Sequence, residues 1–344
     1  MSQYLLMFVT GLGVSLLLTP VARALACRWA VLDCPGERRV HRYPTPLLGG
    51  VAVWAGFTVP VVAFCRLSSP VVGLLAGGFV ILLLGIVDDV VGLKAWQKLL
   101  GQIAASLVLV GFGGRIEFLT NPFGGMIYLS HFAIPLTILW MVALTNVVNF
   151  MDGIDGLAAG ISGIACLTVF SVAVMNRQPY VAPLAVILAG SAFGFLRYNL
   201  HPATVFLGDA GALFLGYTIA GISVIGAVKG ATTLALGIPA AALALPILDT
   251  AYVIAGRISH GAPFYKADNR HLHHRLLDLG LDQKQAAGYM YKISLLLAVG
   301  ALVLSRSPFL VLAVAAAIGL ITLARGIYAV RSSDAGGQRT PKQF

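Results

Sequence analysis

Apolar residues in this 344-residue chain come in blocks of about twenty, separated by short segments that hold charged, Pro, Gly and Asn residues. About 20 apolar residues in a helix cross a hydrocarbon layer of ~30 Å. We therefore expect eleven transmembrane helices. They are predicted near residues 4–22, 47–65, 70–87, 98–114, 131–148, 157–175, 180–196, 210–228, 230–256, 288–304 and 308–324.

Composition supports the same class of protein. Hydrophobic residues make up 58% of the chain and charged residues 10%, whereas about a quarter of a soluble domain is charged. A soluble core cannot absorb that much apolar surface, so the sequence predicts an all-α integral membrane protein. We expect one polytopic membrane domain over residues 1–330 and a disordered cytoplasmic tail over 331–344.

The basic residues predict how the chain is oriented. With eleven spans, eighteen of the 23 Lys and Arg residues fall on one side, which is the cytoplasmic side by the positive-inside rule. The N-terminus is then outside and the C-terminus inside. The net charge of +10 reflects topology and attraction to anionic membrane lipids, and it requires no nucleic-acid partner. Chemistry is expected on the inner segments at 27–46, 88–97, 149–156, 197–209 and 257–287.

The third predicted span ends in Asp88 and Asp89, with Lys94 and Lys98 a few residues further on. Adjacent carboxylates repel unless they share a cation or a proton. The pair therefore indicates a divalent metal or an acid–base role, and a solvated helix end is the plainer alternative.

The fifth predicted span ends in Asn146, Asn149, Asp152 and Asp155, within the run NVVNFMDGIDGLAAG. The first three lie three residues apart, close to one helix face. Amide and carboxylate groups on one face suit binding of a base or sugar, or of a metal. An ordinary helix end would explain the neighbouring glycines but not four polar side chains.

A lone acid, Asp209, lies between two glycines just before the eighth predicted span, with Phe206 three residues earlier. Free amides at a helix start attract phosphate, and an adjacent Asp can hold the magnesium that accompanies a pyrophosphate. A simple helix cap is the alternative for Asp209. Phe206 is placed to stack on a flat base, or else packs in the membrane.

The long inner segment contains His271, His273, His274 and Arg275 in the run RHLHHRLLD. With no cysteine nearby and with basic neighbours, this group favours an anion such as phosphate over zinc.

Asp249 lies within the apolar ninth span, where an acid is by default functional or paired.

Five motifs occur in one order along the chain: R-x-H-x-x-P-x-P-x-x-G-G from Arg39 to Gly50, the D-D pair, N-x-x-N-x-x-D-G-x-D-G-L, F-x-G-D-x-G, and H-x-H-H-R-L. Together they resemble the polyprenyl-phosphate N-acetylhexosamine-1-phosphate transferases of glycosyltransferase family 4, over about residues 10–325. The last motif resembles the branch that uses N-acetylglucosamine and makes the first lipid intermediate of O-antigen or teichoic acid linkage units. The muramyl-pentapeptide branch has three consecutive histidines instead.

The resemblance implies a bacterial inner-membrane enzyme with its active site on the cytoplasmic face. It implies that Asp88, Asp89 and Asp209 are catalytic, and that Asp209 and Asp88 hold Mg²⁺, with Mn²⁺ as an alternative ion. The substrate-binding residues implied are Asn149, Asp152, Asp155, Phe206, His271, His273, His274, Arg275, Lys98, Arg39 and His41.

The expected reaction transfers N-acetylglucosamine 1-phosphate from UDP-N-acetylglucosamine to undecaprenyl phosphate and releases UMP. Direct in-line attack and a covalent aspartyl-phosphate route both remain open. Another UDP-N-acetylated sugar, or UDP-N-acetylmuramyl-pentapeptide, is an alternative donor. An ion-coupled transporter is the alternative from another class, but its acids should cluster near the membrane midplane. Apolar faces between the spans are also compatible with a homodimer.

Overall fold

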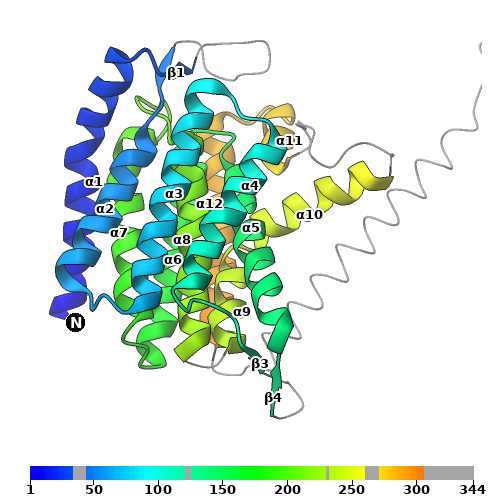
Figure 1. Cartoon of the computed structure of the whole chain (residues 1–344). Helices are drawn as coiled ribbons and strands as arrows, with labels where there is room; N and C mark the ends of the chain where they lie inside the picture. The colour runs from blue at the N-terminus through cyan, green and yellow to red at the C-terminus, as the bar shows by residue number, and fades with distance from the viewer. Residues whose placement is uncertain (34–43, 121–124, 230–231, 260–270, 306–344) are drawn as a thin grey trace, which may run out of the picture.

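The computed structural model describes residues 1–33, 44–120, 125–229, 232–259 and 271–305 as a bundle of roughly parallel and antiparallel helices (Figure 1). Its helices are α1 (Ser2–Arg28), α2 (Gly49–Phe64), α3 (Ser69–Val91), α4 (Ala95–Gly111), α5 (Ala133–Met151), α6 (Leu157–Met175), α7 (Val181–Asn199), α8 (Gly208–Lys229), α9 (Thr232–Ala242), α10 (Ala244–Ser259), α11 (Leu272–Asp278) and α12 (Gln283–Leu304), with the 3₁₀ helix η1 (Ser130–Phe132) before α5.

The structure fits the all-α class, and two short antiparallel strand pairs accompany the helices. β1 (Leu32–Asp33) pairs with β2 (Thr45–Pro46), and β3 (Phe118–Thr120) pairs with β4 (Met126–Tyr128). The two hairpins lie at opposite ends of the bundle, and the N-terminus of α1 lies at the end of β3 and β4 (Figure 1). The segments with candidate chemistry therefore meet at the end opposite the N-terminus.

Helix α8 forms the centre of the bundle. In its most apolar 18-residue stretch 94% of the residues are buried, compared with 28% in α1 and 33% in α12. The outer helices instead expose large apolar side chains, as a helix does where lipid is its solvent. Examples are Leu5, Leu17, Val59, Leu83, Leu107, Leu139 and Leu296.

The expectation of a helical membrane protein is confirmed, whereas the number of eleven spans stays a prediction. Within the described residues, seven helices are long and apolar enough to cross a membrane: α1, α3, α5 together with η1, α6, α7, α8 and α12. The predicted second and fourth spans form helices of 16 and 17 residues. The predicted eleventh span and the tail lie outside the described residues.

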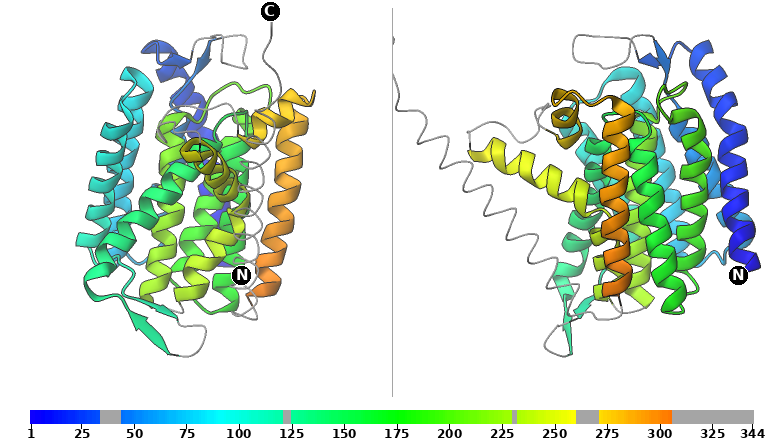
Figure 2. Two further views of the ribbon diagram at one scale, coloured as in Figure 1. Left: turned by 90° about the vertical axis from the view of Figure 1, so that its right-hand side faces the viewer. Right: turned by 180° about the vertical axis from the view of Figure 1, so that it is seen from behind.

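The ninth predicted span is a bent pair rather than a single straight helix. α9 and α10 meet at Leu243 with an angle of 75°, and α10 points away from the bundle in Figure 1 and in the right view of Figure 2. Pro246 stands in the first turn of α10, where its missing N–H costs no helical hydrogen bond. If α9 continued as one straight helix, residue 246 would have to donate its N–H to a carbonyl one turn earlier. Proline has no N–H, so it favours the start of a separate helix at Ala244.

Candidate active site

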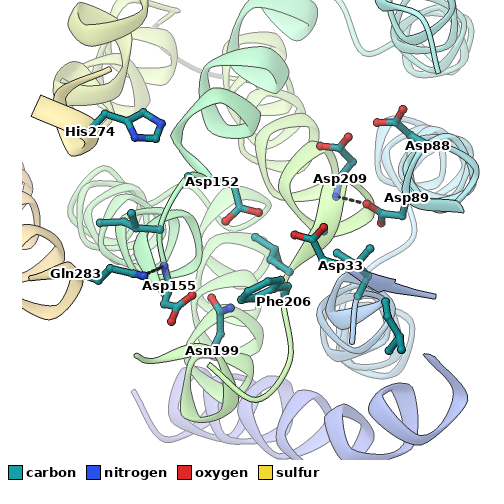
Figure 3. Close-up of a pocket in the computed structure, with 16 residues that line it drawn as sticks. Asp33, Asp88, Asp89, Asp152, Asp155, Asn199, Phe206, Asp209, His274 and Gln283 are labelled. Carbon is teal, nitrogen blue, oxygen red and sulfur yellow. Dashed lines mark hydrogen bonds between the residues drawn. The ribbon is translucent and has the colours of Figure 1, made fainter. Parts of the chain in front are cut away.

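A cavity of about 620 Å³ opens at the end of the bundle that holds β1 and β2. Its walls come from β1, α3, the α5–α6 connection, the end of α7, the start of α8, α11 and α12 (Figure 3). The lining residues are Leu32, Asp33, Leu47, Asp88, Asp89, Asp152, Gly153, Ile154, Asp155, Asn199, Phe206, Leu207, Gly208, Asp209, His274 and Gln283. The sequence predicted six of these sixteen as acidic or histidine site residues, and the structure brings them together. They are Asp88, Asp89, Asp152, Asp155, Asp209 and His274.

Asp209 is the centre of the polar contacts in this cavity. Its Oδ2 atom lies 2.7 Å from the ammonium of Lys98, and its Oδ1 atom accepts a hydrogen bond of 2.5 Å from the amide of Asn149. The same ammonium pairs with Asp88. Lys98 thus lies between two carboxylates and reduces their repulsion.

Asp89 has a different position, because both of its oxygens accept hydrogen bonds from the start of α8. The backbone N–H of Asp209 donates to Oδ1 at 2.8 Å, and that of Ala210 donates to Oδ2 at 3.1 Å. The first amides of a helix have no partner within it, so Asp89 caps α8 from another helix. Asp89 therefore fixes the position of Asp209.

Gly49 and Gly50 of the first motif hold the other side of this helix start. Their N–H groups donate to the carbonyls of Phe206 and Leu207 at 3.1 and 3.0 Å. A Cβ atom on Gly50 would lie 2.2 Å from the backbone nitrogen of Gly211. The glycine pair therefore permits close backbone contact with the loop that carries Phe206 and Asp209.

Asp152 follows the last residue of α5 and lines the cavity. Burial raises the pKa of its carboxyl well above the ordinary value, and the nearby charges of Asp209 and Asp89 raise it further. The protonated form of Asp152 is therefore favoured relative to that of an exposed Asp.

Asp155 is engaged by neighbouring loops. Its Oδ2 atom lies 2.7 Å from His201 Nδ1 and accepts a hydrogen bond of 3.1 Å from the N–H of Ala203, and its own N–H donates to Gln283 Oε1 at 3.3 Å. Asn146, by contrast, turns away from the cavity and exchanges hydrogen bonds with Gln102.

Of the histidine group, only His274 lines the cavity. His271 pairs with Asp249, and the guanidinium of Arg275 lies 5.8 Å from the centre of the Tyr252 ring. His273 is buried, and burial together with the charges of His274 and His271 lowers its pKa to about 3. His273 is therefore neutral near pH 7, and the anion-binding roles predicted for these four residues are supported by position for His274 alone.

Arg39 and His41 lie outside the described residues, so their predicted roles stay predictions. The structure adds Asp33, Asn199 and Gln283, which sequence reasoning missed. Asp33 lies in the basic first inner segment, and a carboxylate among basic residues could have indicated a site residue. Asn199 and Gln283 gave no signal in the sequence, because each lies at a helix end beside an ordinary polar turn.

The donor atoms at Asp88 and Asp209 fit a magnesium ion. Both carboxylates face the same ammonium, so one cationic position is already shared between them. Carboxylate oxygens are the ligands that magnesium prefers. No cluster of three or more His, Cys, Asp or Glu side chains with the geometry of a metal site occurs in the described part of the chain.

Comparison with known proteins identifies the class to which this bundle and cavity belong. Residues 71–227 match the model of glycosyl transferase family 4. The chain is 35% identical over 309 residues to a probable undecaprenyl-phosphate N-acetylglucosaminyl 1-phosphate transferase of Bacillus subtilis, covering 89% of this chain and 86% of the relative.

Other relatives have related names. A decaprenyl-phosphate N-acetylglucosaminephosphotransferase of Mycobacterium tuberculosis is 35% identical over 79% of this chain and 75% of its own length. A phospho-N-acetylmuramoyl-pentapeptide-transferase of Desulfitobacterium hafniense is 33% identical over 61% of this chain and 70% of its own length. The chain therefore belongs to glycosyl transferase family 4, and the family predicted from its motifs is confirmed.

Proposed function

We propose that this protein transfers N-acetylglucosamine 1-phosphate from UDP-N-acetylglucosamine to undecaprenyl phosphate, giving undecaprenyl-diphospho-N-acetylglucosamine and UMP. This would be the first membrane step in synthesis of a cell-envelope polysaccharide. The proposal is supported by the names of the relatives that match most of the chain. It is also supported by a polar cavity at the ends of apolar helices, where a soluble donor and a lipid acceptor can meet.

The observation that carries the proposal is the position of Asp209 between Lys98 and Asn149, with Asp88 beside the same ammonium. Phosphoryl transfer depends on positioning and on neutralising negative charge. Asp88 and Asp209 are held in place beside the ammonium of Lys98, and this ammonium supplies positive charge.

We assign the donor to the wall formed by Asp152, Asp155, Phe206 and His274. Phe206 would stack on the uracil, near Asp155, while His274 would donate a hydrogen bond to the pyrophosphate. Asn149 would orient Asp209 through the hydrogen bond of 2.5 Å. His271, His273, Arg275, Arg39 and His41 belong to the same donor side in this proposal.

The acceptor phosphate would lose its proton to Asp88 or Asp89. Their contacts do not separate the two, because both oxygens of Asp89 accept backbone N–H groups, whereas Asp88 accepts one from Leu93 and pairs through its other oxygen with Lys98. The deprotonated lipid phosphate oxygen then bonds to the β-phosphorus of the donor, the bond from that phosphorus to the oxygen of UMP breaks, and UMP leaves. Lys98 would offset the charge that gathers beside Asp88 and Asp209.

Asp209 and Asp88 would hold Mg²⁺, or Mn²⁺ in its place, which when bound supplies charge neutralisation on the donor pyrophosphate. The proposed topology has eleven spans, an external N-terminus and a cytoplasmic active site in the bacterial inner membrane. A homodimer in the membrane is part of the same proposal.

A muramyl-pentapeptide donor is the second candidate, because relatives of that name match much of the chain. The H-x-H-H-R-L motif favours N-acetylglucosamine instead. The two candidates share the acceptor, the metal and the chemistry, so they differ only in the donor pocket.

The first test is incubation of the purified protein in detergent with labelled UDP-N-acetylglucosamine, undecaprenyl phosphate and Mg²⁺. Label in the lipid phase together with free UMP is expected, and both should disappear with chelator or in Asp209→Asn. Product only with UDP-N-acetylmuramyl-pentapeptide would change the donor, and no product with any UDP-sugar would refute the proposed reaction.

A further inference from the structure

Asp249 is a carboxylate in the apolar helix α10, and it lies outside the residues that line the cavity. Only 14% of its side chain is exposed. An acid in such a place is costly unless it has partners. Its Oδ2 atom lies 2.8 Å from Nδ1 of His271, and its Oδ1 atom accepts a hydrogen bond of 2.8 Å from the N–H of Leu272.

These two hydrogen bonds fix the start of α11. Leu272 is the first residue of that helix, and the first amides of a helix have no partner within it. His271 is the N-cap residue, but in the described structure its side chain caps no amide of α11 and faces Asp249 instead. Asp249 thus caps α11 from a different helix, and the carboxylate selects the tautomer of His271 that has its proton on Nδ1.

A chain of contacts leads from this pair to the cavity. The ring of His271 stacks on that of His273 at 5.8 Å with an interplanar angle of 4°, and the rings of His273 and His274 lie 4.4 Å apart. His273 packs on Gly153, where an added Cβ atom would lie 2.1 Å from its Nε2 atom. Because His273 touches both His271 and His274 and is packed against Gly153, a shift of the start of α11 would also move His274.

We propose that Asp249 is a positioning residue of the donor site, which holds His274 in the cavity through His271 and the first amide of α11. The residue touches no substrate itself. Without Asp249 the first turn of α11 loses both its cap and its tie to α10, so His274 no longer meets the donor in a fixed place. The effect falls on donor binding, because the acceptor side at Asp88 lies across the cavity (Figure 3).

This inference rests on the proposed transferase reaction, and its test separates the two substrates. In Asp249→Ala, which removes both acceptor oxygens, we expect the KM for the UDP-sugar to rise about five- to tenfold, the range that loss of a helix cap implies, while the KM for undecaprenyl phosphate stays within about twofold. The matched control is Glu117→Ala, which also removes a carboxylate, in a half-exposed pair with Arg115 directly before β3. An unchanged donor KM, or an equal rise in both KM values, would overturn the proposal.

A reciprocal exchange tests the pair directly. Asp249→His combined with His271→Asp puts the carboxylate at the N-cap position of α11 and an imidazole opposite, so the donor KM should return to within about threefold of the wild type. A folded exchange variant whose donor KM is as high as that of Asp249→Ala would contradict the proposal. Failure of both variants to give monodisperse protein would assign Asp249 to folding and would also overturn it.

Hydrogen exchange distinguishes failure of this inference from failure of the proposed function. If the wild type transferred no UDP-sugar, the proposed function would fall, and Asp249 would be judged from the peptide that covers α11. Faster amide exchange there in Asp249→Ala than in Glu117→Ala supports the cap, whereas equal exchange refutes it.

Discussion

Asp89 accepts a hydrogen bond of 2.8 Å from the backbone N–H of Asp209, the residue that also contacts Lys98 and Asn149. One acid of the site is therefore placed by another acid, through the backbone of a helix start. This relationship separates the two members of the D-D pair, since Asp88 faces the shared cation and Asp89 holds the helix.

Asp89→Asn tests this separation. An amide oxygen can accept only one of the two N–H groups, while its NH₂ group faces the other donor, so a stability loss of about 1–2 kcal/mol is expected. A displaced Asp209 should lower the turnover rate by about 100-fold. Thermal unfolding and the transfer assay measure the two effects. Full activity in a folded Asp89→Asn protein would show that the cap does not position Asp209.

Lys98→Gln leaves the carboxylates of Asp88 and Asp209 together without their ammonium. A quarter of the Lys98 side chain is exposed, so solvent screens part of this repulsion. In the presence of chelator we therefore expect the free energy of unfolding to fall by about 1–2 kcal/mol. Mg²⁺ should then raise the unfolding temperature more in this variant than in the wild type. Lys292→Gln, at an exposed position on α12, is the control. Equal Mg²⁺ responses in all three proteins would argue against an ion at Asp88 and Asp209.

Asp152→Asn should stabilise the ligand-free protein at neutral pH and abolish transfer. The pKa of this buried carboxyl is raised in the folded state, so the folded protein retains a proton that the unfolded chain releases, and stability falls as the pH rises above the ordinary pKa of Asp. An amide has no such penalty. The gain in unfolding temperature should be about 2–4 °C near neutral pH and should shrink as the pH falls toward 4. A gain that is independent of pH would exclude this cause.

Gly50→Ala tests the contact between the first motif and α8. The new Cβ would overlap backbone atoms of Gly211, which cannot move aside as a side chain can. We therefore expect the free energy of unfolding to fall by about 1–3 kcal/mol and most of the transfer activity to be lost. Gly13→Ala in α1 is the matched control, because a Cβ there meets nothing within 4 Å. Similar unfolding temperatures for the two variants would show that the contact is not a constraint.

The sequence predicted the positions of the helices well and the contacts between them poorly. Bilayer thickness sets the length of an apolar block, so the block pattern alone located helices α1 to α8 and α12. The bend between α9 and α10 was missed because residues 230–256 contain one acidic and no basic residue, so the pattern indicates one continuous span. The 75° angle depends on packing against other helices, which a linear pattern does not contain.

The sequence predicted which acidic residues lie together, while their catalytic roles stay predictions. Asp88, Asp152 and Asp209 converge on one cavity because carboxylates at the ends of apolar helices need shared partners. The same reasoning does not hold for Asn146. Its side-chain amide forms its hydrogen bonds with the side-chain amide of Gln102, on the neighbouring helix α4, and not with the residues of the cavity. The expectation that Asp249 is paired is confirmed by its contacts with His271 and Leu272.

The hydrogen bonds from Gly49 and Gly50 to Phe206 and Leu207, and from Phe206 to Pro46, also determine when the site can form during biosynthesis. The first hairpin and the start of α2 leave the ribosome long before the segment that pairs with them. They must wait in the membrane until the central helix α8 has been inserted. A chain arrested before α8 would therefore have its spans in place and its catalytic end unassembled.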